Sequence, residues 1–335
     1  MRKPTLKDHV LNRVASHVPN LGPSPKRGRI ATLAMAFAAC LSSACAECPE
    51  SDGNFYLWQL ASIHDDVDHL IEVADQTGMT NEIITTNDND IELVLENAEA
   101  AGVKLTPVLV NWGDAVTADG NFDFEAWEEE IRKYESLDLS RFIENGTFSG
   151  VLILDDLGNF TDEGPDSATL DKMARIIKEV FNISYEAFRL IVREDATDLL
   201  RKHNDHEFEH ITDVYVQTSK IKSHDGLEDH LDREDDAAAE IGLWPPIHAV
   251  NLLNWELPDA DGNCPSGYVG PWEGEVRCVI SPEDLAIMAT VFSERCTSGG
   301  GGWKVSDESE FSQDWSFLYQ EPYSSALQEL AAAAK

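Results

Sequence analysis

From Asn54 onward the sequence repeats one unit, a short apolar run followed by a stretch with apolar residues at helical spacing. The apolar runs predict strands at 55–60, 82–86, 103–111, 151–154, 187–193, 211–217, 247–254 and 303–305. The stretches between and after them predict helices at 64–77, 89–101, 122–145 (in two pieces), 167–181, a short one ending near 203, and then 226–241, 282–295 and 322–334. Eight strands that each lead into a helix predict a (β/α)8 TIM barrel, an α/β fold in a single domain.

Two strands fit this pattern poorly. Pro107 lies in the middle of the third, where it removes a hydrogen-bond donor, and the eighth, Trp303-Lys-Val305, is short. The competing fold is a doubly wound open sheet, which is disfavoured because no Gly-x-Gly-x-x-Gly follows the first strand.

The fourth predicted strand has the most informative sequence. Four aliphatic residues, Val151 to Leu154, lead directly into Asp155 and Asp156. An unbroken apolar run of this length is typical of a parallel strand buried on both faces. Parallel α/β folds place their chemistry at the carboxyl ends of such strands, so the two aspartates are candidate site residues. The alternative is that one of them caps the next helix or forms a turn.

The first 46 residues differ from the rest. The segment up to Arg29 is basic, residues 30–39 are apolar except for Thr32, and Ala44-Cys45-Ala46 offers a cleavage site. This order predicts a signal peptide with a basic N-terminal extension at 1–46, and a barrel domain at 47–335 with a long loop at 256–277. We therefore expect a secreted or cell-envelope protein. Lipid anchoring through Cys45, which ends a degraded lipobox, is the alternative.

Charge excludes two classes of partner. Removing seven basic and one acidic residue with the segment 1–46 from totals of 25 and 62 leaves 18 and 61, a formal charge of −43. Such a surface repels nucleic acid and anionic membranes, and no integral membrane span is expected in the mature chain. The charge favours solubility in a salty medium. The oligomeric state has no signature in the sequence.

Cleavage after Ala46 leaves four cysteines, at positions 48, 264, 278 and 296. An even number in an exported protein predicts disulfides. Because Cys278 and Cys296 flank the predicted helix 282–295, we expect them to pair, which leaves Cys48 with Cys264.

Several motifs together resemble a known group of proteins. In order, they are Gly150-Val-Leu-Ile-Leu-Asp-Asp156, Ile191-Val-Arg193, Asp213-Val-Tyr215, Val250-Asn-Leu-Leu-Asn254 and the helix between Cys278 and Cys296. The series resembles bacterial secreted or lipoprotein-like barrels of the glycosidase-like superfamily, over roughly residues 54 to 330. The resemblance implies a barrel with a carbohydrate-type cleft. The sequence departs from the pattern at Leu157, where a proline is expected after the acidic residue.

The predicted strand ends carry aromatic, amide and carboxylate side chains and one arginine. The candidates for substrate binding are Trp58, Asn111, Trp112, Asp155, Arg193, Tyr215, Gln217, Asn251, Asn254, Trp255 and Trp303. Sugars are bound by such a set, because their C–H faces stack on indole rings and their hydroxyls pair with amides and carboxylates. The sequence therefore predicts a saccharide or polyol ligand.

Glycoside hydrolysis requires two carboxyl groups on either side of the scissile bond. Asp156 is the candidate acid, with its pKa raised by Asp155, and Glu256 is the candidate partner, with Glu194 as its substitute. Arg193 would keep the second carboxylate ionised. The alternative function is a non-catalytic glycan-binding barrel at the cell surface.

No metal or other cofactor is predicted. The ten histidines show no metal-ligand spacing, and none lies at a predicted strand end. Asp259-Ala-Asp-Gly-Asn263 resembles a calcium loop only in its alternating oxygens, and we expect an ordinary turn there.

Overall fold

The structure is a computed structural model that describes residues 48, 53–58, 67–154, 164–184, 188–202, 207–218, 224–252, 259, 261–264, 269–272, 275–303 and 321–333. The predicted signal segment lies outside these residues. All of the described residues belong to the unit Cys48–Lys335.

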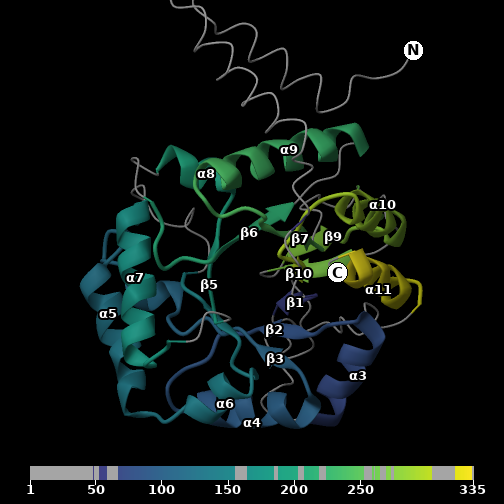
Figure 1. Cartoon of the computed structure of the whole chain (residues 1–335). Helices are drawn as coiled ribbons and strands as arrows, with labels where there is room; N and C mark the ends of the chain where they lie inside the picture. Colours follow the sequence, from purple (N-terminus) through teal and green to yellow (C-terminus); the bar gives the residue numbers. More distant parts are fainter. Residues whose placement is uncertain are drawn as a thin grey trace, which may run out of the picture. The chain divides into compact units, whose positions relative to one another are not determined.

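Eight parallel strands form one sheet in the order β3-β2-β1-β10-β7-β6-β5-β4. They are β1 (Phe55–Trp58), β2 (Asn81–Ile83), β3 (Lys104–Leu105), β4 (Gly150–Leu152), β5 (Arg189–Arg193), β6 (Asp213–Thr218), β7 (Ile247–Asn251) and β10 (Gly299–Trp303). The two outer strands of this order, β3 and β4, are joined by bridges from Leu105 to Phe148 and from Val108 to Leu152. The sheet therefore curls into a ring, and the predicted (β/α)8 barrel is confirmed (Figure 1).

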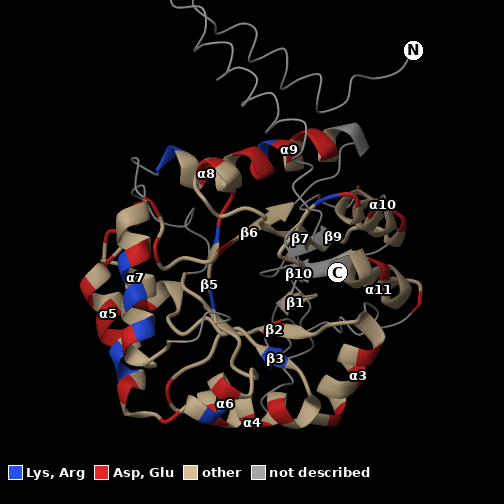
Figure 2. Ribbon diagram, in the orientation of Figure 1, with Lys and Arg blue, Asp and Glu red and all other residues tan. Residues whose placement is uncertain are grey.

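Helices surround this ring (Figure 1). They are α3 (Val67–Thr77), α4 (Ile91–Ala101), α5 (Phe124–Arg132), α6 (Ser140–Glu144), α7 (Ser167–Val180), α8 (Ala196–Arg201), α9 (His224–Glu240), α10 (Pro282–Ser293) and α11 (Tyr323–Ala333). The helical stretch predicted at 122–145 is divided as expected, with the 3-10 turn η3 (Lys133–Ser136) between α5 and α6. Charged residues lie mostly on the helices, whereas the strands carry few (Figure 2). None of the described helices is both long and apolar enough to cross a membrane.

The third strand is much shorter than predicted. Its ladder covers only Lys104 and Leu105, and one isolated bridge at Val108 continues it. Pro107 lies between the two and cannot donate a hydrogen bond, which explains the interruption. The segment 256–277, predicted as a long loop over a site, includes most of an antiparallel hairpin of β8 (Val269–Trp272) and β9 (Glu275–Cys278).

The eighth barrel strand, β10, begins at the glycine run, four residues before the predicted start at Trp303, and residues 304 and 305 lie outside the described part of the chain. Tyr56 and Tyr215 fill the barrel beside it, with buried rings in edge-to-face contact at 6.5 Å. A Cβ atom at Gly301 would lie 2.8 Å from the Tyr215 hydroxyl and 3.1 Å from the Tyr56 carbonyl oxygen. The prediction missed the glycines because glycine is disfavoured in strands unless another group approaches closely, and here the Tyr215 ring approaches Gly301 and the Tyr56 ring approaches Gly299.

Gly301→Ala is therefore expected to lower the free energy of unfolding by about 1 to 3 kcal/mol, as overpacking does in a filled core. Gly113→Ala is the matched control, because no atom lies within 4 Å of a Cβ placed there. Combining Gly301→Ala with Tyr215→Phe removes the closest contact and should restore part of the loss. Urea unfolding of the four chains measures this, and equal stability of the Gly301 and Gly113 variants would contradict the packing account.

Polar side chains occupy the amino-terminal end of the barrel interior. Arg189 and Asp213 form an ion pair at 3.1 Å, and Asn81 donates to Ser149 Oγ at 2.8 Å. Asp213 and Asn81 are buried, so these bonds satisfy the Asp213 carboxylate and the Asn81 amide nitrogen where water does not reach. Each of the four residues lies at or just before the start of its strand. Their contacts with one another therefore fill this end of the barrel. The opposite, carboxyl end is the one available for a site.

The disulfides connect Cys48 with Cys296 and Cys264 with Cys278. The predicted pairing of Cys278 with Cys296 is wrong. Helix α10, with 12 residues, lies between these two cysteines and is about 18 Å long at 1.5 Å per residue. A disulfide requires Cα atoms closer than about 7 Å, so residues at opposite ends of this helix cannot pair. Disulfides indicate an oxidising compartment.

Candidate functional site at the carboxyl end of the barrel

The ends of β5 and β6 carry a hydrogen-bonded pair. Arg193 Nε donates to Gln217 Oε1 at 2.9 Å, and both side chains are partly buried. The register aligns Arg193 with Tyr215, so Gln217 is the next residue of β6 on the same face. The Gln217 Nε2 group is buried and has no hydrogen-bond partner among the described residues. This amide is thus a donor that a ligand hydroxyl could use.

Further strand ends join this pair in ring order. Asn251, which ends β7 and is 3% exposed, is aligned with Trp303 at the end of β10. β10 in turn pairs with β1, which ends at Trp58. Five neighbouring strands therefore end together, and each contributes a predicted site residue. The side chains of Trp58 and Trp303 lie outside the described part of the chain.

Tyr215 lies deeper than the other candidates. Its ring is fully buried against Tyr56 in the middle of the barrel, one layer below Gln217. Tyr215 thus supports the floor of a site. Asn111 and Trp112 follow β3 at the start of the 3-10 helix η2 (Trp112–Ala115), and the Trp112 side chain is 38% exposed.

Both members of the predicted catalytic pair, Asp156 and Glu256, lie outside the described residues, whereas the substitute Glu194 is described. The described residues also exclude Asp155, Asn254 and Trp255. The chain leading to the two aspartates is described up to the buried Leu154, and Leu152 is aligned with Ile191, two residues before Arg193. The strand that leads to Asp155 and Asp156 is therefore the direct neighbour of the strand that ends at Arg193.

A groove of about 330 Å³ lies between the starts of α5 and α7, and sequence reasoning missed it. Phe122, Phe124, Gly164, Pro165, Asp166, Thr169 and Lys172 line it. Lys172 Nζ lies 3.7 Å from the Phe124 ring centroid, and Asp166 caps α7 by accepting from Thr169 N. Both helices begin on the side of the barrel where β3 and β4 end, so the groove lies on the side of the candidate site.

A second polar cluster begins directly after β5. Asp195 is the N-cap residue of α8, but its side chain makes no capping bond. Its carboxylate lies with His230 and Glu234 of α9, and one potential ligand atom from each residue lies within 4.8 Å of the other two. The pKa of Asp195 is raised to about 7, first by burial and then by the nearby carboxylates, Glu234 foremost. Burial is also the main cause that lowers the pKa of His230.

This cluster was not predicted from the sequence. Glu194, whose Oε1 accepts from the Asp195 backbone N at 3.1 Å, was a candidate, but Asp195 was not expected to meet α9. The available signal was the spacing of His230 and Glu234, since residues four apart lie on one face of a helix. The contribution of Asp195 depends on the packing of α8 against α9, which no local pattern shows.

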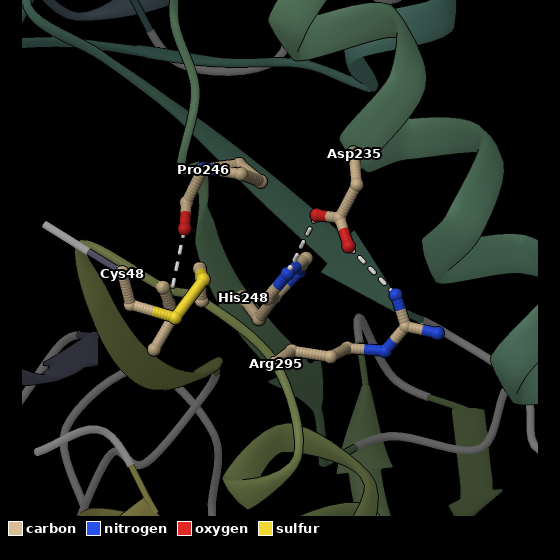
Figure 3. The surroundings of a disulfide bond; sticks show 7 residues. Cys48, Asp235, Pro246, His248 and Arg295 are labelled. Carbon is tan, nitrogen blue, oxygen red and sulfur yellow. Dashed lines mark hydrogen bonds and ion pairs between the residues drawn. A yellow bond between two sulfur atoms is a disulfide. The ribbon is translucent and has the colours of Figure 1, made fainter. Parts of the chain in front are cut away.

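A third cluster links β7 to the helices outside the ring. His248 is fully buried on the outer face of β7, and its Nε2 lies 3.1 Å from Asp235 Oδ1 (Figure 3). Arg295 contacts the other oxygen of Asp235 at 2.6 Å and also Asp232 at 2.6 Å. Because Arg295 precedes Cys296, this network lies close to the Cys48–Cys296 disulfide (Figure 3). The network thus connects α9 with β7 and with the residue pair that follows α10.

The turn at Asp259–Asn263 is consistent with the ordinary turn expected there. Asp259 Oδ1 accepts from the backbone N–H groups of Asp261 and Asn263, both at 2.9 Å. These backbone bonds, the one from Asn263 first, lower the pKa of Asp259. The aspartate therefore already has partners within its own turn.

Comparison with known proteins shows a shared fold. No protein-family model and no curated protein matches the chain. A solved β-glucanase from Saccharophagus degradans is similar at 12% identity and a TM-score of 0.53, over 84% of this chain and 88% of that one. A mutant group II chitinase catalytic domain from Ostrinia furnacalis, in complex with penta-N-acetylchitooctaose, is similar at 11% identity and a TM-score of 0.51, over 85% and 98%. The barrel is thus one that glycoside hydrolases also use, which confirms the expected fold.

Proposed function

We propose that the protein is an exported, carbohydrate-active enzyme that hydrolyses glycosidic bonds at the carboxyl end of its barrel. The observation that carries the proposal is the arrangement of strand ends around Arg193. The Arg193–Gln217 pair lies beside the strand that leads into Asp155 and Asp156. Asn251 ends the next strand after β6 in ring order. Amide and guanidinium groups from different parts of the sequence thus end neighbouring strands, beside the strand that the sequence continues into Asp155 and Asp156, and this arrangement supports a sugar site.

Each residue has a distinct chemical role in this proposal. Asp156 donates a proton to the leaving oxygen, and repulsion from Asp155 keeps it protonated at higher pH. Glu256 or Glu194 supplies the second carboxylate, which acts as nucleophile or activates water depending on its distance from Asp156. Arg193 favours the ionised form of that carboxylate. Gln217 donates its buried Nε2 hydrogens to a sugar hydroxyl.

Aromatic residues would provide the stacking surfaces. Trp112 is exposed next to the end of β3, and Trp58, Trp255 and Trp303 are the further candidates. Indole faces stack on the C–H faces of pyranose rings. The names of the two solved relatives point to β-glucans and to N-acetylglucosamine polymers, and these polysaccharides are the first substrates to test.

Export is supported by two independent features. The segment 1–46 has the order of a secretory signal, and the four remaining cysteines form two disulfides. An exported enzyme would meet extracellular polysaccharides as substrates. Release into the medium and lipid anchoring through Cys45 both place the barrel outside the cytoplasm.

The test is a screen of β-glucans, chito-oligosaccharides and aryl glycosides with the purified protein. Two readouts are needed, the release of reducing ends and the midpoint temperature of unfolding with each oligosaccharide. We expect both hydrolysis and a rise in the midpoint for at least one glycan class. A rise without hydrolysis would replace the enzyme by a glycan-binding barrel, and the absence of both responses would refute the carbohydrate function.

A further inference from the structure

We propose that Asp195, His230 and Glu234 form a binding site for one divalent transition-metal ion, with Zn²⁺ as the best fit. The site lies between α8 and α9, in the helical layer outside the strand ring. It is therefore separate from the proposed sugar site, although Asp195 is only two residues from Arg193 along the chain.

The geometry of the three side chains fits an ion. His230 Nδ1 and Glu234 Oε1 are 3.9 Å apart, too far for a hydrogen bond. Ligand atoms bound to one Zn²⁺ at about 2.0 to 2.2 Å lie roughly 3 to 4 Å from each other. One such atom from each residue lies within 4.8 Å of the others. Displacements of the ligand atoms by about 1 Å, through side-chain rotation, would therefore bring all three into contact with one ion.

The Glu234 carboxylate is buried and already oriented. Its side chain is 2% exposed, and it accepts from Thr197 N at 3.1 Å and from Thr197 Oγ1 at 2.9 Å. Outer hydrogen bonds of this kind commonly fix the ligands of a metal site. Thr197 is therefore a positioning residue for Glu234.

The charge in the cluster is unbalanced. Within the described part of the chain, neither Asp195 nor Glu234 forms an ion pair with a lysine or arginine. Arg295, which follows α10, contacts Asp232 and Asp235 instead. Two carboxylates that share a partly buried space repel each other, and the Asp195 side chain lies near Glu234 without capping α8. A divalent cation would neutralise both.

The ligand types select among cations. One imidazole nitrogen with two carboxylate oxygens suits Zn²⁺ and its first-row neighbours, whereas Ca²⁺ and Mg²⁺ prefer oxygen ligands only. Three protein ligands leave a further position for water. Bound here, the ion would clamp α8 to α9 and so hold the segment that follows β5.

The test is to remove bound metal from the full chain with a chelator and then to titrate it with Zn²⁺, with binding monitored by calorimetry. About 0.5 M NaCl screens the acidic surface. We expect one site with a dissociation constant in the micromolar range or below. Zn²⁺ at about 100 times that constant should raise the midpoint of thermal unfolding by roughly 5 °C or more. Ca²⁺ should give no such rise.

Four variants make the test specific. Asp195→Asn and His230→Gln should each weaken Zn²⁺ binding at least about tenfold, and Thr197→Val by about 10- to 100-fold. Asp229→Asn, on the exposed face of the same helix, is the matched control and should bind as the wild type does. Unfolding in chelator checks that each variant folds, and Asp195→Asn is the mildest change because it keeps the side-chain shape.

Cobalt provides a spectroscopic check, because Co²⁺ in the same site should give a visible absorption band that the Asp195 and His230 variants lack. Equal Zn²⁺ affinity and stoichiometry in the wild type and in these two variants would place the ion elsewhere and overturn the proposal. The absence of Zn²⁺ binding in the wild type would also overturn it, and would indicate that the two carboxylates share a proton instead.

Discussion

Replacing Asp156 with asparagine is expected to lower the rate of polysaccharide hydrolysis by about 10²- to 10⁴-fold, the usual contribution of a general acid. The amide keeps the shape of the side chain but cannot donate a proton to the leaving oxygen. The loss should be much smaller with a nitrophenyl glycoside, because nitrophenolate leaves without protonation. Initial rates on both substrates measure the difference.

The matched control for this variant is Asp261→Asn, an exposed aspartate in the turn that follows Glu256 along the chain. It makes the same change in charge and volume and should leave both rates unchanged. Hydrolysis that is unaffected by Asp156→Asn would remove Asp156 from the mechanism. An equal loss on both substrates would assign it a role other than proton donation, such as that of the nucleophile.

Removing the Cys48–Cys296 disulfide by changing both cysteines to alanine is expected to lower the free energy of unfolding by about 5 kcal/mol. The cysteines are 248 residues apart, and a crosslink that closes so long a loop removes much of the entropy of the unfolded chain. The Cys264–Cys278 disulfide closes a loop of only 14 residues, for which the same reasoning gives about 3 kcal/mol.

Urea unfolding of the two double variants compares these values directly. Each pair serves as the control for the other, because each loses one crosslink and two sulfur atoms. Cys278 is buried, so its replacement adds a loss of packing to the short-loop variant. This extra loss makes the two variants more similar in stability, so a larger effect of the long loop would be the more convincing. A smaller effect for the long loop than for the short one would show that loop entropy does not dominate here.

The pairing of these cysteines shows how far sequence reasoning could have gone. The helix 282–295 was predicted, and its length alone forbids the bond between Cys278 and Cys296 that was expected. The correct partners could not be chosen in the same way. Cys48 lies close to Cys296 because β1, near the start of the barrel domain, pairs with β10, near its end, when the ring closes.

The glycine strand was not predicted, for a different reason. Strand prediction relies on side chains that prefer the extended state, and Gly299–Trp303 has only one side chain larger than hydrogen. Glycine is needed in this strand because Tyr56 of β1 and Tyr215 of β6 lie so close to it that they leave no room for a side chain. The Asp195 cluster likewise joins a strand end to a helix that begins almost 30 residues later in the sequence.

By itself, the sequence determined the fold class, because the alternation of apolar runs and helical spacing is local and repeats around the whole ring. It also predicted that Arg193, Gln217 and Asn251 lie at the ends of their strands. The tertiary structure alone decided which strands are neighbours, which cysteines pair, where glycine must stand and how Asp195 meets α9. These features depend on contacts between segments distant in the sequence, and such contacts follow from packing and closure of the ring, which no local pattern encodes.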